Sequence, residues 1–138
     1  LEKVREIAKT ENSDTGGPLL ADPFFKRKVA ELEIDLTALE FTELRTLAGE
    51  SSGKGPGPES SILKIKGTEI QQRLNELALE AVGHYGAPYL RDLGHNANIG
   101  PDYAEGLAGA YFNGRKTSIY GGSNEIQRNI IAKAVLGL

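Results

Sequence analysis

The sequence has 138 residues, no cysteine, and 16 basic residues interspersed with 19 acidic ones, which gives a net charge of −3. Without clustered lysine and arginine it lacks the basic patch that binding to DNA or RNA requires, and without cysteine it has neither disulfides nor a thiol nucleophile. No apolar run approaches the roughly 18 residues that span a bilayer. We therefore expect a soluble cytoplasmic protein with one domain over residues 1–138.

Amphipathic helices separated by turn-forming stretches account for the first half of the chain. Residues 1–11 repeat apolar side chains at helical spacing, and because this pattern is already under way at Leu1, we expect the chain to be a piece of a longer protein. The turn formers of residues 12–21 end this helix. Asp22 and Pro23 then supply an N-cap and a first helical residue, which predicts a helix of roughly 25 residues. Its expected buried positions are Phe25, Val29, Leu32, Leu36, Leu39, Leu44 and Leu47.

A second long helix is predicted after a break at residues 49–61, a stretch rich in glycine, proline and serine. This helix opens at Pro58 and Glu59. It is expected to stop near Tyr85, because Gly86 can take the left-handed position that follows a helix. Its predicted buried stripe consists of Leu63, Ile70, Leu74, Leu77 and Ala81, and Gly67 would permit a close helix crossing.

The last third of the chain predicts two shorter helices. The first follows Asp102, with Tyr103, Leu107, Ala110 and Tyr111 on one side. The second follows Gly121 and Gly122 and is capped by Ser123. Its expected apolar stripe is Ile126, Ile130, Ile131 and Ala134. Several helices, short connections and no alternating strand pattern predict an all-α antiparallel helical bundle of the four-helix type.

The residue types present limit the kinds of functional site that the chain can form. His84 and His95 are the two histidines, and with no cysteine or H-E-x-x-H pattern beside them a metal site is not expected. No serine nucleophile motif is present. The turn at Gly121–Ser123 suits a phosphate group, because it opens a helix whose first N–H groups and dipole favour negative charge. A turn that only connects two elements is the alternative. For Tyr85, the alternative to ligand contact is a packed core aromatic.

Two stretches resemble a known family of flavoenzymes. IYGGSNEIQRNIIAKAVLGL, at the C-terminus, resembles the C-terminal signature of the acyl-CoA dehydrogenase family. AVGHYGAPYLRD, residues 81–92, is similar to a second flavin-contacting turn of the same helical domain. Within the family, the sequence is nearest to the pimeloyl-CoA dehydrogenase large-subunit type.

The resemblance implies an FAD-dependent oxidoreductase of fatty acid metabolism, for which this chain would supply part of the FAD site and the oligomer contacts. The full-length parent would carry out the α,β-dehydrogenation of an acyl-CoA thioester and pass electrons to an electron-transfer flavoprotein. A homodimer or homotetramer is expected, and the piece alone is expected to be inactive. The alternative is a non-catalytic partner subunit or helical scaffold that completes a neighbour's flavin site.

The resemblance also implies cofactor-binding residues: the backbone at Gly83 and Gly86, the Ser123 hydroxyl on a phosphate, and Glu125 on the adenosine part. No residue is assigned as catalytic. Many relatives carry their glutamate base at the position of Gly121, which has no carboxylate and cannot act as a base. Other branches carry the base on an earlier helix, at a position that would precede the first residue here.

Overall fold

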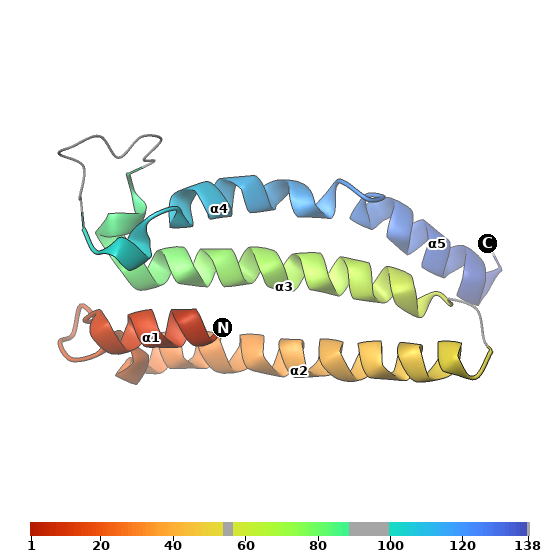
Figure 1. Ribbon diagram of the computed structural model, residues 1–138, viewed down its shortest axis with the longest axis horizontal. Coiled ribbons are helices and arrows are strands. Elements are labelled where there is room, and N and C mark those ends of the chain that lie inside the picture. The colour runs from red at the N-terminus through yellow and green to blue at the C-terminus, as the bar shows by residue number, and fades with distance from the viewer. Residues whose placement is uncertain (54–56, 89–99, 138) are drawn as a thin grey trace. The chain divides into compact units, whose positions relative to one another are not determined.

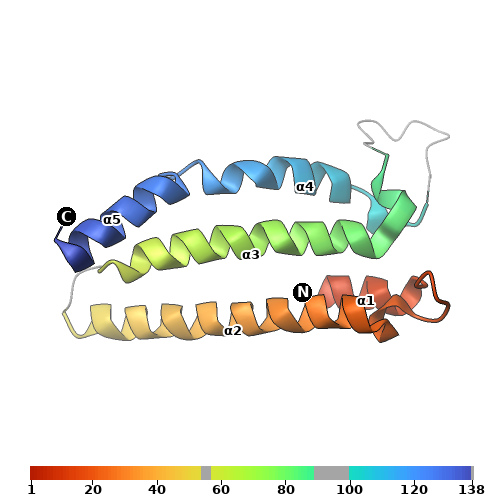
Figure 2. The same ribbon diagram turned by 180° about the vertical axis from the view of Figure 1, so that it is seen from behind.

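The computed structural model describes residues 1–53, 57–88 and 100–137, and within them it contains helices and no strand (Figure 1 and, from behind, Figure 2). This confirms the predicted all-α class. None of the described helices is both long and apolar enough to cross a membrane. The α-helices are α1 (Glu2–Thr10), α2 (Pro23–Ser51), α3 (Glu59–Val82), α4 (Leu107–Gly114) and α5 (Asn124–Leu136). Single turns of 3-10 helix are η1 (Leu19–Ala21), η2 (Gly83–Gly86), η3 (Asp102–Ala104) and η4 (Arg115–Ser118).

The chain divides into two compact units, and α2 and α3 each contribute to both. Unit 1 comprises Leu1–Glu33 and Gln72–Arg115. Unit 2 comprises Ile34–Gln71 and Lys116–Leu138. The candidate site residues are therefore distributed between two bodies, each with its own packing.

Unit 1 packs α1 and α4 with the beginning of α2 and the end of α3. The Lys28 ammonium pairs with Glu80 at 2.7 Å, and Glu31, one turn further along α2, lies 3.9 Å from Arg73, which is earlier in α3. Because the partners run in opposite order, α2 and α3 are antiparallel here. The buried apolar side chains of unit 1 are Val4, Ile7, Ala8, Phe25, Val29, Leu32, Leu77, Ala78, Ala81, Val82, Ala104 and Ala108.

The start of α2 follows the sequence prediction. Asp22 caps the helix, since its Oδ1 accepts hydrogen bonds from the backbone N–H groups of Phe24 at 2.9 Å and Phe25 at 3.0 Å. Pro23 is the first helical residue, where the missing N–H costs nothing. The helix then runs for 29 residues to Ser51, so it continues three residues into the predicted break.

A hydrogen bond joins the end of α1 to η3. The Tyr103 hydroxyl donates to Oε1 of Glu11, the residue that follows α1, at 2.6 Å. This bond to a carboxylate, with desolvation as a smaller cause, raises the pKa of Tyr103 to about 12. The hydroxyl therefore keeps its proton and acts as a donor at neutral pH. The bond joins two residues that are 92 positions apart in the sequence and attaches the loop after α1 to η3.

The predicted end of α3 and the predicted start of the next helix are both wrong in detail. Helix α3 ends at Val82, because Gly83, and not Gly86, takes the left-handed conformation, with φ of 52°. Similarly, α4 begins at Leu107 and not directly after Asp102, because Gly106 interrupts the segment with φ of 75°.

Unit 2 packs α5 with the end of α2 and the beginning of α3. Gly67 of α3 faces α2, where an added Cβ would lie 3.9 Å from Leu39 Cδ2. That is ordinary van der Waals contact, so the predicted close crossing does not require glycine there. The buried residues of this unit are Ser61, Ile65, Ile70, Thr117 and Asn124, and three of the five are polar.

Much of the apolar surface that the sequence assigned to the core of this unit is exposed. Leu44 and Leu47 on α2 are each 54% exposed, and Ile126 and Ile130 on α5 are 52% and 45% exposed. The predicted buried stripes of these two helices are therefore wrong in unit 2, and the buried residue of α5 is Asn124, which was not on its predicted stripe. Helix α5 makes polar contacts with α3, at Lys64, Thr68 and Glu69.

Candidate cofactor-binding site

The turn before α5 has the geometry of an anion-binding loop. Gly121 and Gly122 are exposed and both left-handed, with φ of 67° and 85°. Ser123 caps the helix: its hydroxyl accepts from the Ile126 N–H at 3.4 Å, as the sequence predicted. At Gly121 an added Cβ would meet nothing within 4 Å, so the backbone is open on that side. A ligand can therefore approach the main chain closely at the N-terminus of a 13-residue helix.

Glu125 lies in the first turn of α5 beside Ser123. Hydrogen bonds from its own backbone N–H and from the Ser123 hydroxyl lower the pKa of Glu125, and the positive charges of Arg128 and Lys64 lower it further. The carboxylate is consequently ionised at neutral pH and is suited to accept hydrogen bonds from hydroxyl or amino groups. Among the predicted site residues, the structure brings Ser123 and Glu125 into direct interaction.

The other predicted turn lies in unit 1, on a cavity of about 770 Å³. Gly83, His84 and Tyr85 form one side of it, and the loop between α1 and α2 forms another. Tyr85 is 43% exposed and is therefore not a core aromatic. The residues that line this cavity are Glu11, Asn12, Ser13, Asp14, Thr15, Leu19, Asp22, Phe24, Phe25, Glu80, Ala81, Gly83, His84 and Tyr85.

Gly86 has a packing role that the sequence did not reveal. It is buried, and an added Cβ would lie 3.1 Å from Leu79 Cγ and 3.3 Å from the Leu79 carbonyl oxygen. A side chain at Gly86 would therefore require Leu79 to shift by a few tenths of an ångström. Gly83 is exposed, with nothing within 4 Å of an added Cβ, so of the two glycines it is Gly83 that a ligand can reach.

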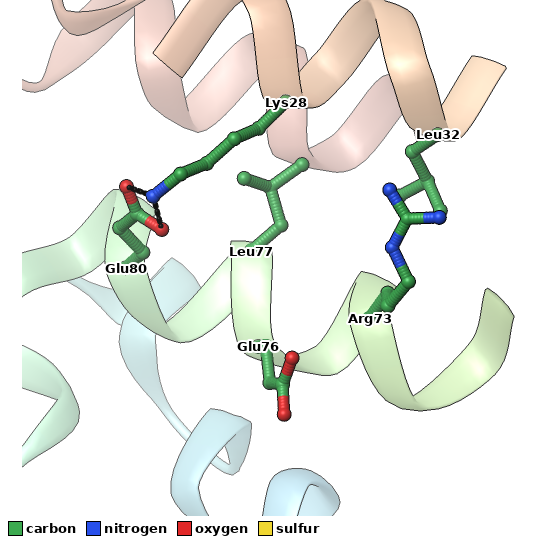
Figure 3. A pocket seen from close by; sticks show the side chains of 6 residues that line it. All are labelled: Lys28, Leu32, Arg73, Glu76, Leu77 and Glu80. Atoms are coloured by element: carbon green, nitrogen blue, oxygen red, sulfur yellow. Dashed lines mark hydrogen bonds and ion pairs between the residues drawn. The ribbon is translucent and has the colours of Figure 1, made fainter. Parts of the chain in front are cut away.

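One of the carboxylates at this end of α3 is neutralised by a lysine. Lys28 Nζ donates to both oxygens of Glu80, at 2.7 and 2.8 Å, across a small neighbouring hollow of about 160 Å³ (Figure 3). In the same view the Leu77 side chain points toward α2, and the Glu76 carboxylate points away from it. Glu76 pairs instead with Arg115, at 2.7 Å.

The two turns differ in the part of a dinucleotide that they can accept. Four carboxylates line the cavity beside Gly83, and one of them, that of Glu80, has a lysine partner in Lys28. A diphosphate would be repelled there, whereas ribose hydroxyls and an adenine amino group are donors that carboxylates accept. The turn at Gly121–Ser123 offers backbone N–H groups, a helix N-terminus and the nearby cation of Lys64, which fit a phosphate.

Several residues at these turns were missed or are not described. No motif pointed to Asn124, yet it is the one buried residue of α5. Phe24 and Asp14 line the unit 1 cavity although no motif pointed to them. His95 lies outside the described residues. Among the residues that the structure does describe, no group of three histidines, aspartates or glutamates could hold a metal ion.

Comparison with known proteins identifies the family to which this fold and these turns belong. The profile of the acyl-CoA dehydrogenase C-terminal domain matches residues 1–136. The chain therefore belongs to the acyl-CoA dehydrogenase family, as the C-terminal helical domain, and this confirms the resemblance seen in the sequence.

Individual relatives agree with the family assignment. The acyl-CoA dehydrogenase IpdE1 of Mycobacterium tuberculosis is 32% identical over 118 residues, which are 85% of this chain and 27% of the relative. Among solved structures, a ChsE4–ChsE5 complex from Mycobacterium tuberculosis has a TM-score of 0.74 at 23% identity, over 99% of this chain and 33% of that one. PigA with FAD and proline also has a TM-score of 0.74, at 20% identity, over 99% and 32%. The chain thus spans about a quarter to a third of the length of these proteins.

Proposed function

We propose that this chain is the C-terminal domain of a longer FAD-dependent acyl-CoA dehydrogenase and that it contributes contacts to the flavin. The observation that carries the proposal is the turn before α5, where two left-handed glycines and a serine-capped helix N-terminus coincide with the family's C-terminal signature. The PigA structure, which shares the fold, contains FAD.

In this proposal the residues of the chain bind and orient the cofactor. The backbone at Gly121 and Gly122, together with the Ser123 hydroxyl, receives a phosphate group, while Glu125 accepts hydrogen bonds from the adenosine part. To donate to a phosphate, the Ser123 hydroxyl must exchange its bond to Glu125 for one to the ligand. The Gly83 turn offers its backbone and acidic surroundings to uncharged donor groups.

Bound FAD would supply the hydride acceptor for α,β-dehydrogenation of an acyl-CoA thioester, and an electron-transfer flavoprotein would be the electron acceptor of the parent. The base that removes the α-proton is not found in the turn, because Gly121 has no side chain. It would come from the remainder of the parent.

Flavin content tests the proposal directly. The purified full-length protein is expected to show the two visible absorbance bands of an oxidised flavin, to release FAD on denaturation, and to bleach when an acyl-CoA is added without oxygen. Acyl-CoAs of different chain length, tested in turn, would identify the substrate class. A colourless protein that added FAD does not reconstitute would contradict the assignment.

A second function, a non-catalytic partner subunit, is favoured specifically by glycine at position 121. The fold is shared with a chain of the ChsE4–ChsE5 complex, which contains two different proteins. A partner subunit would bind FAD only when mixed with its catalytic partner. The residue on the buried face of the helix that precedes Leu1 discriminates between the two functions: a glutamate there favours an enzyme, and its absence favours a partner subunit.

We also propose that the parent is a homodimer or homotetramer, because α5 exposes several large apolar side chains. These are Ile126, Ile130, Val135 and Leu136, at 45–68% exposed. Burying one such isoleucine contributes about 1.5–3 kcal/mol. An Ile126→Lys, Ile130→Lys double variant is therefore expected to dissociate the oligomer at concentrations where the unsubstituted protein is assembled.

Light scattering over a range of protein concentrations measures this. Asn129→Lys, an exposed position on the same helix, is the control for added charge and is expected to remain assembled. An unsubstituted protein that stays monomeric at high concentration would show that α5 is not an interface.

A further inference from the structure

A single buried side chain of α5 connects the candidate flavin turn to α3. Asn124 is 6% exposed and is the one buried residue between Asn124 and Leu136, the span of α5. The apolar residues of this helix are half-buried or exposed, so they provide little to fix the position of its first turn. The turn that carries Gly121, Ser123 and Glu125 must be located by polar contacts.

The contacts of Asn124 form a chain of hydrogen bonds that ends on the backbone of α3. Lys64 Nζ donates to Asn124 Oδ1 at 2.8 Å. Thr68 Oγ1 lies 3.3 Å from both Oδ1 and Nδ2 of the amide, and the Thr68 hydroxyl donates to the Ile65 carbonyl at 2.9 Å, which leaves Oγ1 to accept from Nδ2. Because an ammonium group can only donate, Lys64 determines which end of the amide is the oxygen.

The other polar link between these helices is weaker. Arg128 lies 3.4 Å from Glu69, and the two side chains are 56% and 37% exposed, so solvent screens the pair. Asn124 itself is buried, and its partners Lys64 and Thr68 are half-buried, so this network is less screened than the Arg128–Glu69 pair and an unpaired Asn124 amide would be costly. Lys64 also brings a positive charge to the turn, as its effect on Glu125 shows.

We propose that Asn124 is a positioning residue: through Lys64 and Thr68 it fixes the Gly121–Glu125 turn on α3 and keeps the Lys64 cation beside the phosphate position. This inference rests on the proposed FAD function for its second half only. The position of the turn can be tested in the flavin-free protein, and the affinity for FAD is tested separately.

The test uses four forms of the full-length protein: unsubstituted, Asn124→Leu, Asn124→Asp and Asn129→Leu. Leucine has a similar shape but neither donates nor accepts. Aspartate keeps an acceptor for Lys64 and can accept from the Thr68 hydroxyl, so it is the conservative rescue. Asn129 is exposed on the same helix and controls for a leucine substitution in α5.

The backbone N–H of Gln127 donates to the Ser123 carbonyl and reports on the first turn of α5. In the flavin-free protein, Asn124→Leu is expected to speed hydrogen exchange of this amide on the order of tenfold. Asn124→Asp and Asn129→Leu are expected to exchange at the rate of the unsubstituted protein. In a flavin titration, Asn124→Leu is expected to raise the dissociation constant of FAD on the order of tenfold, with rescue by Asn124→Asp. Lys64→Met is expected to reproduce both effects, and it takes the place of Asn124→Leu if that variant does not fold.

Unchanged exchange in Asn124→Leu would overturn the positioning role. Faster exchange with an unchanged FAD constant would overturn the link to the cofactor. If the unsubstituted protein binds no FAD, the proposed function fails, but the exchange measurement still decides whether Asn124 fixes the turn.

Discussion

A Phe25→Ala substitution is expected to lower the free energy of unfolding by about 3–5 kcal/mol, the usual cost of truncating a fully buried phenylalanine. Phe25 is 1% exposed and lies in the first turn of α2, directly after the Asp22 cap. Its removal takes apolar area out of the core of unit 1 and leaves a void next to the existing cavity beside Gly83. Urea unfolding followed by circular dichroism measures the change.

The neighbouring residue provides a matched control. Phe24 is 71% exposed and has the same side chain in the same helical turn, with its backbone N–H bonded to the same cap. Phe24→Ala is expected to change stability by less than about 0.5 kcal/mol, as for other surface substitutions. Equal losses in the two variants would contradict the burial that distinguishes these side chains.

A Gly121→Glu substitution is expected to give the largest functional change. If the full-length protein lacks a carboxylate base elsewhere, this variant should accelerate flavin reduction by an acyl-CoA by about 10²–10⁴-fold, the usual contribution of a positioned general base. The position is exposed and has nothing within 4 Å of an added Cβ, so the side chain has room. The cost is backbone strain of roughly 1–2 kcal/mol, because φ at Gly121 is 67°.

Single-turnover bleaching of the flavin measures the rate, and Gly121→Gln is the control, because glutamine imposes the same strain without a basic carboxylate. A protein that already has a base on its preceding helix would gain little from either variant. Equal rates for the glutamate and glutamine variants of a base-free protein, with flavin bound, would show that residue 121 does not face the acyl chain.

Local capping chemistry made the helix starts predictable from sequence. Two residues supply an acceptor for the unpaired N–H groups of a first turn: Asp22 before Pro23, and Ser123 after two glycines. The structure shows that they cap α2 and α5, as predicted. The choice between Gly83 and Gly86 at the end of α3 depended on packing. Leu79 occupies the space beside Gly86, and a contact of this kind has no signature in the local sequence.

The site was less predictable than the fold, because its anchor joins distant segments. Asn124 and its partners Lys64 and Thr68 are separated by 60 and 56 residues. One signal was available: Lys64 and Thr68 are four residues apart and therefore share a face of α3. Because that face also carries the buried Ser61, the sequence could have indicated a polar contact there.

Helical periodicity predicted an apolar stripe on α5 that the structure does not bury, whereas the buried residue of this helix is Asn124. Ile126 and Ile130 lie on the predicted stripe, yet they remain about half exposed. A sequence pattern reports which side chains avoid water. Whether they are covered by the same chain or by another one depends on how many helices are near them, and this is a property of the assembly.

If the parent assembles as proposed, the exposed apolar side chains of α5 also matter for a newly made copy of the protein that has not yet bound its partner. In such a copy Val135 and Leu136, at 63% and 68% exposed, are the kind of surface that chaperones bind and that promotes aggregation. Degradation of unassembled copies would compete with assembly. Because assembly becomes faster at higher concentration, the amount of assembled protein in a cell would rise more steeply than the rate of synthesis. The helix that carries the candidate flavin turn would thereby also influence how much of the newly made protein survives to assemble.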